Sequence, residues 1–216
     1  GTGEAHQLRL SFEKVSGKDL NWFFNQWYFG SGYPKLEVKS SYDAMKKQVT
    51  VSIAQTQDQK FEFPLAIDIL ENGKLTRKNV WVAASSKNDF FFDAAKNPEL
   101  INANADGVLL CDLEQAKTPE QLYLQYTNSK DLYSKYTAIE ASKENVGKNP
   151  FATKTVLAAL KDNFYRNRLE ALASIPEESK DFLVDVEKLA QNDPKTLVKG
   201  SAIGVLVKTK NAKYLP

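Results

Sequence analysis

The sequence predicts an α+β protein of several domains: a short helical segment, an antiparallel β-sandwich and an all-α domain of repeated helices. Two changes of hydrophobic period predict it. Apolar residues recur at helical spacing up to residue 32, alternate with a period of two over 33–115, and return to helical spacing over 116–216. At 216 residues, each longer segment can bury its own core. We therefore expect domains at 1–32, 33–115 and 116–216.

The first segment should hold two helices. Residues 4–14 place Leu8 and Phe12 near one face, with charged residues between them. A second helix should start at Gly17 to Asp19 and stop where Gly30 and Gly32 free the backbone. Its expected buried face comprises Leu20, Phe23, Phe24 and Trp27. The junction to the next domain then rests on Trp27, Gly32 and Pro34, because proline cannot continue a helix.

The middle segment alternates apolar and polar residues, as strands with one buried face do. Turn residues fill the gaps, and Asn72-Gly73 suits a two-residue hairpin. About seven short strands fit two packed antiparallel sheets. The alternating runs are 36–38, 49–53, 61–69, 80–82 and 90–92, and the apolar run 108–110 should close the domain.

Aromatic residues in this segment allow two interpretations. Trp81, Phe90, Phe91 and Phe92 could stack on a sugar or peptide. Aromatic residues at strand spacing can also fill the core of a small sandwich. Because the segment has no second row of aromatic residues, we favour the interpretation that these side chains belong to the core.

The last segment is helical throughout. Thr118-Pro119-Glu120-Gln121 is a capping box with proline at the first helical position. We expect Asp193 to be the N-cap of the last helix and Pro194 its first residue. The expected helices are 118–127, 130–144, 151–161, 163–175, 177–191 and 194–209.

A weak repeat, basic-x-x-Ala-Ile/Leu, recurs in this segment at spacings of 33 and 31 residues, within the range of stacked helix pairs of the HEAT or armadillo type. The small alanine lets helices approach, and the basic residue should meet a carbonyl end or a neighbouring acid. A basic groove for an anionic ligand is the alternative, which interspersed acids disfavour. The repeat positions are Lys135, Ala138, Ile139, Arg168, Ala171, Leu172, Lys199, Ala202 and Ile203.

Composition bounds the chemistry. The net charge of +2 calls for neither nucleic acid nor an anionic membrane, and no apolar run is long enough to span a membrane. Cys111, the only cysteine, should be a buried small apolar residue. His6, the only histidine, cannot form a His-Glu-x-x-His zinc motif and receives no role. We expect no catalytic, metal or cofactor residue here, although carboxylate-only chemistry such as glycoside hydrolysis stays open.

The junction carries a family resemblance. Gly17, Phe23-Phe24, Trp27 and the run Gly32-x-Pro34-x-Leu36-x-Val38 resemble the point where the thermolysin-like catalytic domain of aminopeptidase N-type (gluzincin) zinc peptidases passes into a β-sandwich. Gln55-x-Gln57, Phe63-Pro64-Leu65 and Leu100-Ile101-Asn102-x-Asn104 resemble later features of that sandwich. The sequence departs at Gly107 to Leu110, where many relatives carry an aromatic residue and an arginine.

The resemblance implies a C-terminal fragment that begins after the zinc motif of its parent enzyme, as the opening Gly1-Thr2-Gly3 without methionine also leads us to expect. The parent would remove N-terminal residues from peptides with a zinc-bound water. This part would contact its own upstream catalytic domain, brace it and restrict substrate access. The localisation stays unknown, although we favour the periplasm or cell envelope.

Two other functions stay open. Some relatives have lost the zinc motif and act as protein-interaction scaffolds. An independent peptide- or glycan-binding module would show an exposed aromatic patch. The peptidase interpretation instead predicts an exposed apolar face around Leu20, Phe24 and Trp27, where the catalytic domain is absent.

Overall fold

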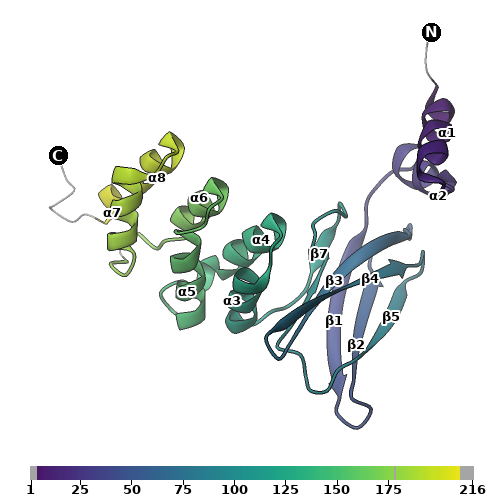
Figure 1. Ribbon diagram of the computed structural model, residues 1–216, viewed down its shortest axis with the longest axis horizontal. Coiled ribbons are helices and arrows are strands. Elements are labelled where there is room, and N and C mark those ends of the chain that lie inside the picture. The colour runs from purple at the N-terminus through teal and green to yellow at the C-terminus, as the bar shows by residue number, and fades with distance from the viewer. Residues whose placement is uncertain (1–3, 178, 210–216) are drawn as a thin grey trace.

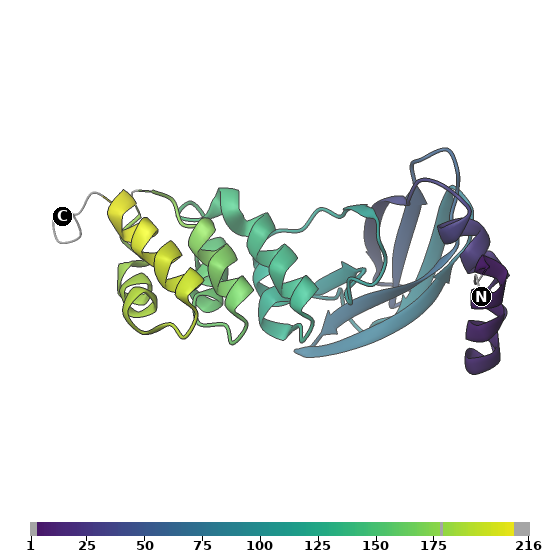
Figure 2. The same cartoon turned by 90° about the horizontal axis from the view of Figure 1, so that it is seen from above.

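The computed structural model describes residues 4–177 and 179–209. Figures 1 and 2 show an elongated arrangement, with short helices at the N-terminal end, two sheets in the middle and stacked helices towards the C-terminus. The predicted α+β class is confirmed. None of the helices in the described ranges is long and apolar enough to cross a membrane.

The N-terminal helices differ in detail from the prediction. Helix α1 is Ala5–Ser16, and α2 (Asn21–Phe23) runs into a π-helical turn, η1 (Phe24–Tyr28). Gly17 does not start the second helix, because its left-handed conformation, with φ at 68°, ends the first.

The expected buried face of the second helix is only partly correct. Phe24 is buried and Trp27 packs on Phe61, whereas Phe23 is exposed. The i→i+5 bonding of η1 spreads side chains more widely than the 3.6-residue period assumed from the sequence. The exposed face predicted around Leu20, Phe24 and Trp27 is therefore wrong, since Phe24 is buried and Trp27 packs against the β core.

Seven strands in the described ranges form two sheets. The four-stranded sheet has the order β5-β2-β1-β7 and the three-stranded sheet β4-β3-β6. Strand β2 alternates strictly between buried and half-buried residues, and its Val49, Val51 and Ile53 meet β3 in one shared apolar core. The strands are β1 Lys35–Asp43, β2 Gln48–Gln55, β3 Phe63–Glu71, β4 Lys74–Val82, β5 Lys87–Asp93, β6 Leu100–Ala103 and β7 Asp112–Glu114.

The strand expected at 108–110 is wrong. The last strand is β7, which pairs in parallel with β1, and Val108 and Leu110 are exposed. The Asn104 side-chain amide binds both the backbone N–H and the carbonyl of Leu109. The main chain here is thus partly satisfied by a side chain rather than by a neighbouring strand.

Six α-helices in the described ranges make up the last segment. The capping box is confirmed, because Thr118 and Gln121 exchange both predicted hydrogen bonds. A short 3₁₀ turn, η2 (Lys143–Asn145), follows α4. The helices are α3 Pro119–Asn128, α4 Leu132–Ser142, α5 Pro150–Ala159, α6 Tyr165–Ala173, α7 Leu183–Asn192 and α8 Thr196–Lys208.

Two helix starts differ from the sequence prediction. Helix α7 begins at Leu183 rather than 177, after a turn in which the Ser179 N–H donates to the Pro176 carbonyl. The N-cap of α8 is Lys195 rather than Asp193. The Asp193 carboxylate accepts the Lys195 N–H but is also held by Arg168, so the helix starts later.

We expect Gly107→Ala to lower the free energy of unfolding by about 2–4 kcal/mol. Gly107 has φ at 67°, and an added Cβ would lie 2.4 Å from Cγ of Tyr133. Gly73→Ala is the control, because Gly73 has φ at 72° with open space around it. It should cost only about 1 kcal/mol in the same urea titration. Equal losses would contradict a close contact between the loop and α4.

Candidate functional site

Among the described residues, no group of three or more His, Cys, Asp or Glu side chains could hold a metal ion. His6 is exposed on α1, with its Nδ1 3.2 Å from Glu4. Cys111 is half-buried against the β core, and burial raises the pKa of its thiol to about 11. The thiol therefore stays protonated at neutral pH, which does not suit a nucleophile.

A chain of aromatic contacts attaches the N-terminal helices to the sheets. The rings of Trp22 and Trp81 meet edge to face at 4.9 Å, and those of Trp27 and Phe61 lie 5.4 Å apart. Gln26 reinforces the attachment, since its amide accepts the Glu62 N–H and donates to the Glu62 carbonyl. This junction holds α2 and η1 against the sheets, whereas α1 buries none of its residues.

The outer surface of the N-terminal helices is apolar and exposed. Figure 1 shows α1 standing clear of both sheets. Exposed apolar side chains concentrated on one short helical segment are typical of a surface that a partner covers. We call this surface the N-terminal apolar face; its residues are Leu8, Phe12 and Val15 on α1, together with Tyr28 and Phe29 at the end of η1.

The four aromatic residues considered as a stacking platform separate in the structure. Phe90 and Phe92 pack against the β core, as favoured from the sequence. Trp81 and Phe91 are exposed but lie in different sheets, Trp81 beside Trp22. These four residues therefore do not share one strand or one sheet face.

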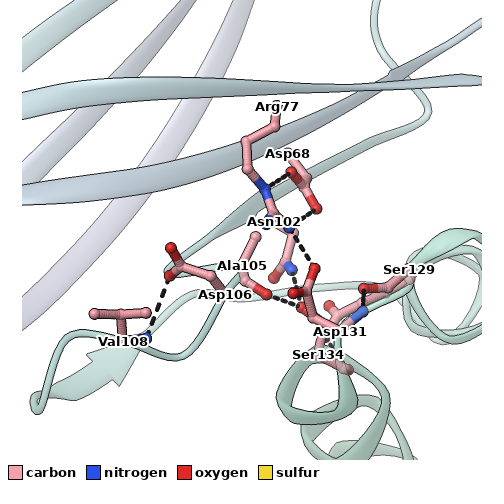
Figure 3. Close-up of polar contacts among 10 residues, drawn as sticks. Asp68, Arg77, Asn102, Ala105, Asp106, Val108, Ser129, Asp131 and Ser134 are labelled. Carbon is pink, nitrogen blue, oxygen red and sulfur yellow. Dashed lines mark hydrogen bonds and ion pairs between the residues drawn. The ribbon is translucent and has the colours of Figure 1, made fainter.

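The sheets meet the helical segment through a polar joint, which we define as Asp68, Arg77, Asn102, Asp131 and Ser134. Asp68 lies in register with Arg77 on one neighbouring strand and with Asn102 on the other, so the three form a row across the sheet. Figure 3 shows this row facing the start of α4.

Arg77 is the central contact of the joint. Its guanidinium donates to both oxygens of Asp68, at 2.8 and 2.9 Å, and to Oδ2 of Asp131 at 2.5 Å. These two carboxylates raise the pKa of Arg77 further. Because Asp68 is buried, removing the guanidinium would leave its charge unpaired, which costs several kcal/mol in proteins.

A second series of hydrogen bonds joins the sheet to α4 beside Arg77. Asn102 donates to the Ser134 hydroxyl at 2.8 Å, and that hydroxyl donates to the Ala105 carbonyl at 2.7 Å. The Lys117 ammonium donates to Asn102, and burial lowers the pKa of Lys117 to about 8. The buried polar groups of the joint are thus mutually paired, which favours a single orientation of the two segments.

The predicted repeat positions occupy equivalent places in the helical segment. Ala138, Ala171 and Ala202 are all fully buried. Lys135 meets Oδ2 of Asp162 at 3.2 Å.

Arg168 and Lys199 make the other two contacts of the repeat. Arg168 binds both oxygens of Asp193, at 2.6 and 2.9 Å. The Lys199 ammonium donates to the Gln191 carbonyl. Each basic residue therefore lies beside an acid or a backbone carbonyl of the same chain.

Sequence reasoning missed the acidic half of this pattern. Asp131, Asp162 and Asp193 follow one another at 31 residues, each in the turn before the second helix of a pair. We call them the turn aspartates. Each forms an ion pair with a basic residue that comes earlier in the chain: Asp131 with Arg77 of the sheet, Asp162 with Lys135 and Asp193 with Arg168. The exact spacing was a readable signal.

A groove of about 780 Å³ lies between the turns of the last two helix pairs, and of the three basic repeat residues only Arg168 lines it. Its lysines do not stand alone: Lys161 pairs with Asp185 at 3.2 Å, and Lys195 lies over the Tyr165 ring. Asp162 and Asp193 also line it. Mixed charge gives the groove no clear preference for an anion.

Comparison with known proteins shows a similarity of fold. No family model matches the sequence, and no curated protein matches it. The structure is similar to that of Legionella pneumophila aminopeptidase A in complex with aspartic acid, with a TM-score of 0.64 and 20% sequence identity. The match covers 95% of this chain and 25% of that chain. The chain therefore shares a fold with about a quarter of an aminopeptidase.

We expect acid to destabilise the helical segment through Asp193, the last of the turn aspartates. Burial raises the pKa of Asp193, but Arg168 and the Lys195 N–H outweigh it and lower the pKa overall. The stabilisation is complete above the unfolded-state value of about 4 and is lost as pH falls through the lower folded value. Circular dichroism melts between pH 7 and 2 should show this loss.

Asp193→Asn should remove about 3 kcal/mol of stability at pH 7, since it leaves Arg168 buried without its carboxylate. Its stability should then depend less on pH below 4 than that of the parent chain. Asp181→Asn, at an exposed position before α7, is the matched control and should change neither quantity. Acid curves that stay the same in both variants would contradict the assignment.

Proposed function

We propose that this chain is the non-catalytic C-terminal portion of an aminopeptidase N-type, thermolysin-like zinc peptidase. The observation that carries the proposal is the similarity of fold over 95% of the chain to one quarter of an aminopeptidase. The junction motif Gly32-x-Pro34-x-Leu36-x-Val38 supports it independently, since Pro34 precedes β1 and Leu36 and Val38 enter the β core.

In this proposal each segment has an architectural role. Residues 1–32 are the terminal helices of the upstream catalytic domain, and 33–115 form a β-sandwich that braces it. The helices of 116–216 are a HEAT- or armadillo-like array beside the substrate path. The polar joint at Arg77 supports such a role, because an array that restricts access must keep a fixed direction relative to the sheets.

The N-terminal apolar face supports a contact with the proposed catalytic domain. Phe12 and Val15 on α1 and Phe29 after η1 are exposed here, and a neighbouring apolar groove of about 370 Å³ is lined in part by Trp22 and Val108. Burying such a surface stabilises an interface by roughly 25 cal/mol per Å². The proposed first partner is therefore the upstream catalytic domain of the same protein.

The zinc of the proposed enzyme has no place among the residues described here. His6 is the only histidine of the chain, and it lies beside Glu4 alone on an exposed helix. We propose that the metal and its ligands belong to the catalytic domain, which also binds the peptide substrate. This chain then contributes position and access rather than chemistry.

The test is an assay of the complete product of the reading frame that encodes this sequence, against a panel of N-terminal aminoacyl reporter substrates. We expect cleavage that a zinc chelator abolishes and added zinc restores, with no cleavage by residues 1–216 alone. A complete product that stays silent with zinc supplied would contradict the peptidase function and favour a non-catalytic interaction scaffold.

A further inference from the structure

A pocket of about 380 Å³ lies between the sheets and the first helical pair. Strand β6 contributes Asn102 to it, the segment after β7 contributes Lys117, and α3 and α4 contribute Gln125 and Glu140. The polar joint borders this pocket, because Asn102 belongs to both. The volume falls within the usual range of small-molecule sites, about 300–1,000 Å³.

The Lys117 ammonium in this pocket is a cation without an acid beside it. Across residues 4–177 and 179–209, its hydrogen-bond partner is the Asn102 side-chain oxygen alone, at 2.7 Å, although an ammonium carries further N–H donors. Burial by itself lowers the pKa of Lys117, with no contribution from a carboxylate. The charge is partly desolvated and uncompensated, which favours an anionic group in the pocket.

The same pocket contains an acceptor without a donor. Gln125 is 2% exposed, and its side-chain N–H groups donate to the Ser134 carbonyl and the Thr137 hydroxyl. Its side-chain oxygen is buried, and none of the described residues donates to it. Because a buried carbonyl oxygen without a donor costs free energy, a donor group in this pocket would be stabilising.

The remaining walls of the pocket narrow the class of ligand. Glu140 lines the pocket but does not contribute to the pKa of Lys117, so the pocket carries a positive and a negative group that do not neutralise each other. Leu113 and Leu122 add an apolar wall. Water brings no charge to Lys117, and a simple anion brings no donor to Gln125. A zwitterion with an apolar side chain matches all of these groups.

We propose that this pocket binds a free α-amino acid with an apolar side chain. The carboxylate of the amino acid accepts from Lys117, and its ammonium donates to Gln125 and faces Glu140. Hydrogen bonds between charged groups of this kind are stronger than those between neutral groups. Its side chain contacts Leu113 and Leu122. Because sheet and helices both build the pocket, the bound amino acid adds a contact between them beside the polar joint.

The test titrates L-leucine into the full chain and follows the amide signals by two-dimensional NMR. We expect saturable shifts of the backbone amides of Leu113 and Lys117 and of the side-chain amide of Gln125. Two analogues each lack one charge: leucinamide has no carboxylate, and isocaproate has no amino group. Each analogue should bind about tenfold more weakly than leucine, or weaker still.

Substitutions in the pocket separate recognition of each charge. Lys117→Met keeps an apolar stem and removes the ammonium, so it should weaken leucine binding by about tenfold or more. Glu140→Gln, at an exposed position, should weaken leucine binding by about threefold and leave isocaproate binding unchanged. Lys130→Met, at an exposed position outside the pocket, is the matched control and should change neither affinity. Circular dichroism spectra check that each variant is folded.

Three outcomes would overturn the proposal: no saturable shift with leucine, an analogue that binds as tightly as leucine, or leucine binding that survives Lys117→Met in full. Inorganic phosphate that binds as tightly as leucine would instead make the pocket a simple anion site, which also contradicts the proposal. The proposal does not rest on the peptidase function, and none of these outcomes depends on aminopeptidase activity.

Discussion

The guanidinium of Arg77 is the contact on which the relation between sheets and helices depends. It lies between a buried carboxylate of its own sheet, Asp68, and the carboxylate of Asp131 before α4. A planar donor with several fixed N–H groups can satisfy both acceptors at once, which a lysine ammonium cannot do with the same directional precision. The first helical pair is thereby held against the sheet in a defined orientation.

The same chemistry then recurs along the helical segment. Asp162 accepts both Lys135 and the Tyr126 hydroxyl, and Asp193 accepts Arg168 through both oxygens. Two turn aspartates also accept a backbone N–H just before the next helix: Asp162 from Phe164 and Asp193 from Lys195. Asp131 is itself the N-cap residue of α4. Arg77 of the sheet therefore pairs with the first turn aspartate in the same way as Lys135 and Arg168 pair with the second and third.

Features that depend on near neighbours in sequence were predictable. The alternation of Val49, Val51 and Ile53 gave a strand, and Thr118 with Gln121 gave a helix start, because both signals lie within a few residues. The errors have distant causes. Asp193 reads as an N-cap until Arg168, 25 residues away, is known to hold its carboxylate.

The polar joint was beyond sequence reasoning for the same reason. Arg77 and Asp131 are 54 residues apart, and no sequence pattern near either residue predicts that the two form an ion pair. The 31-residue spacing of the turn aspartates is visible in the sequence, although the sequence prediction gave a structural role only to Asp193, as an N-cap. The apolar side chains of α1 were assigned correctly to one helix, whereas their exposure depends on what packs around that helix.

The central claim is that paired charges at the joint fix the helical array relative to the sheets. Its most direct test is a distance distribution by pulsed electron resonance between spin labels at Met45 and Leu197, two exposed positions in the two segments, with Cys111 replaced by alanine. A single narrow distribution that broadens in Arg77→Met is the predicted result. A broad distribution with Arg77 present, or a narrow one that survives its loss, would contradict the account.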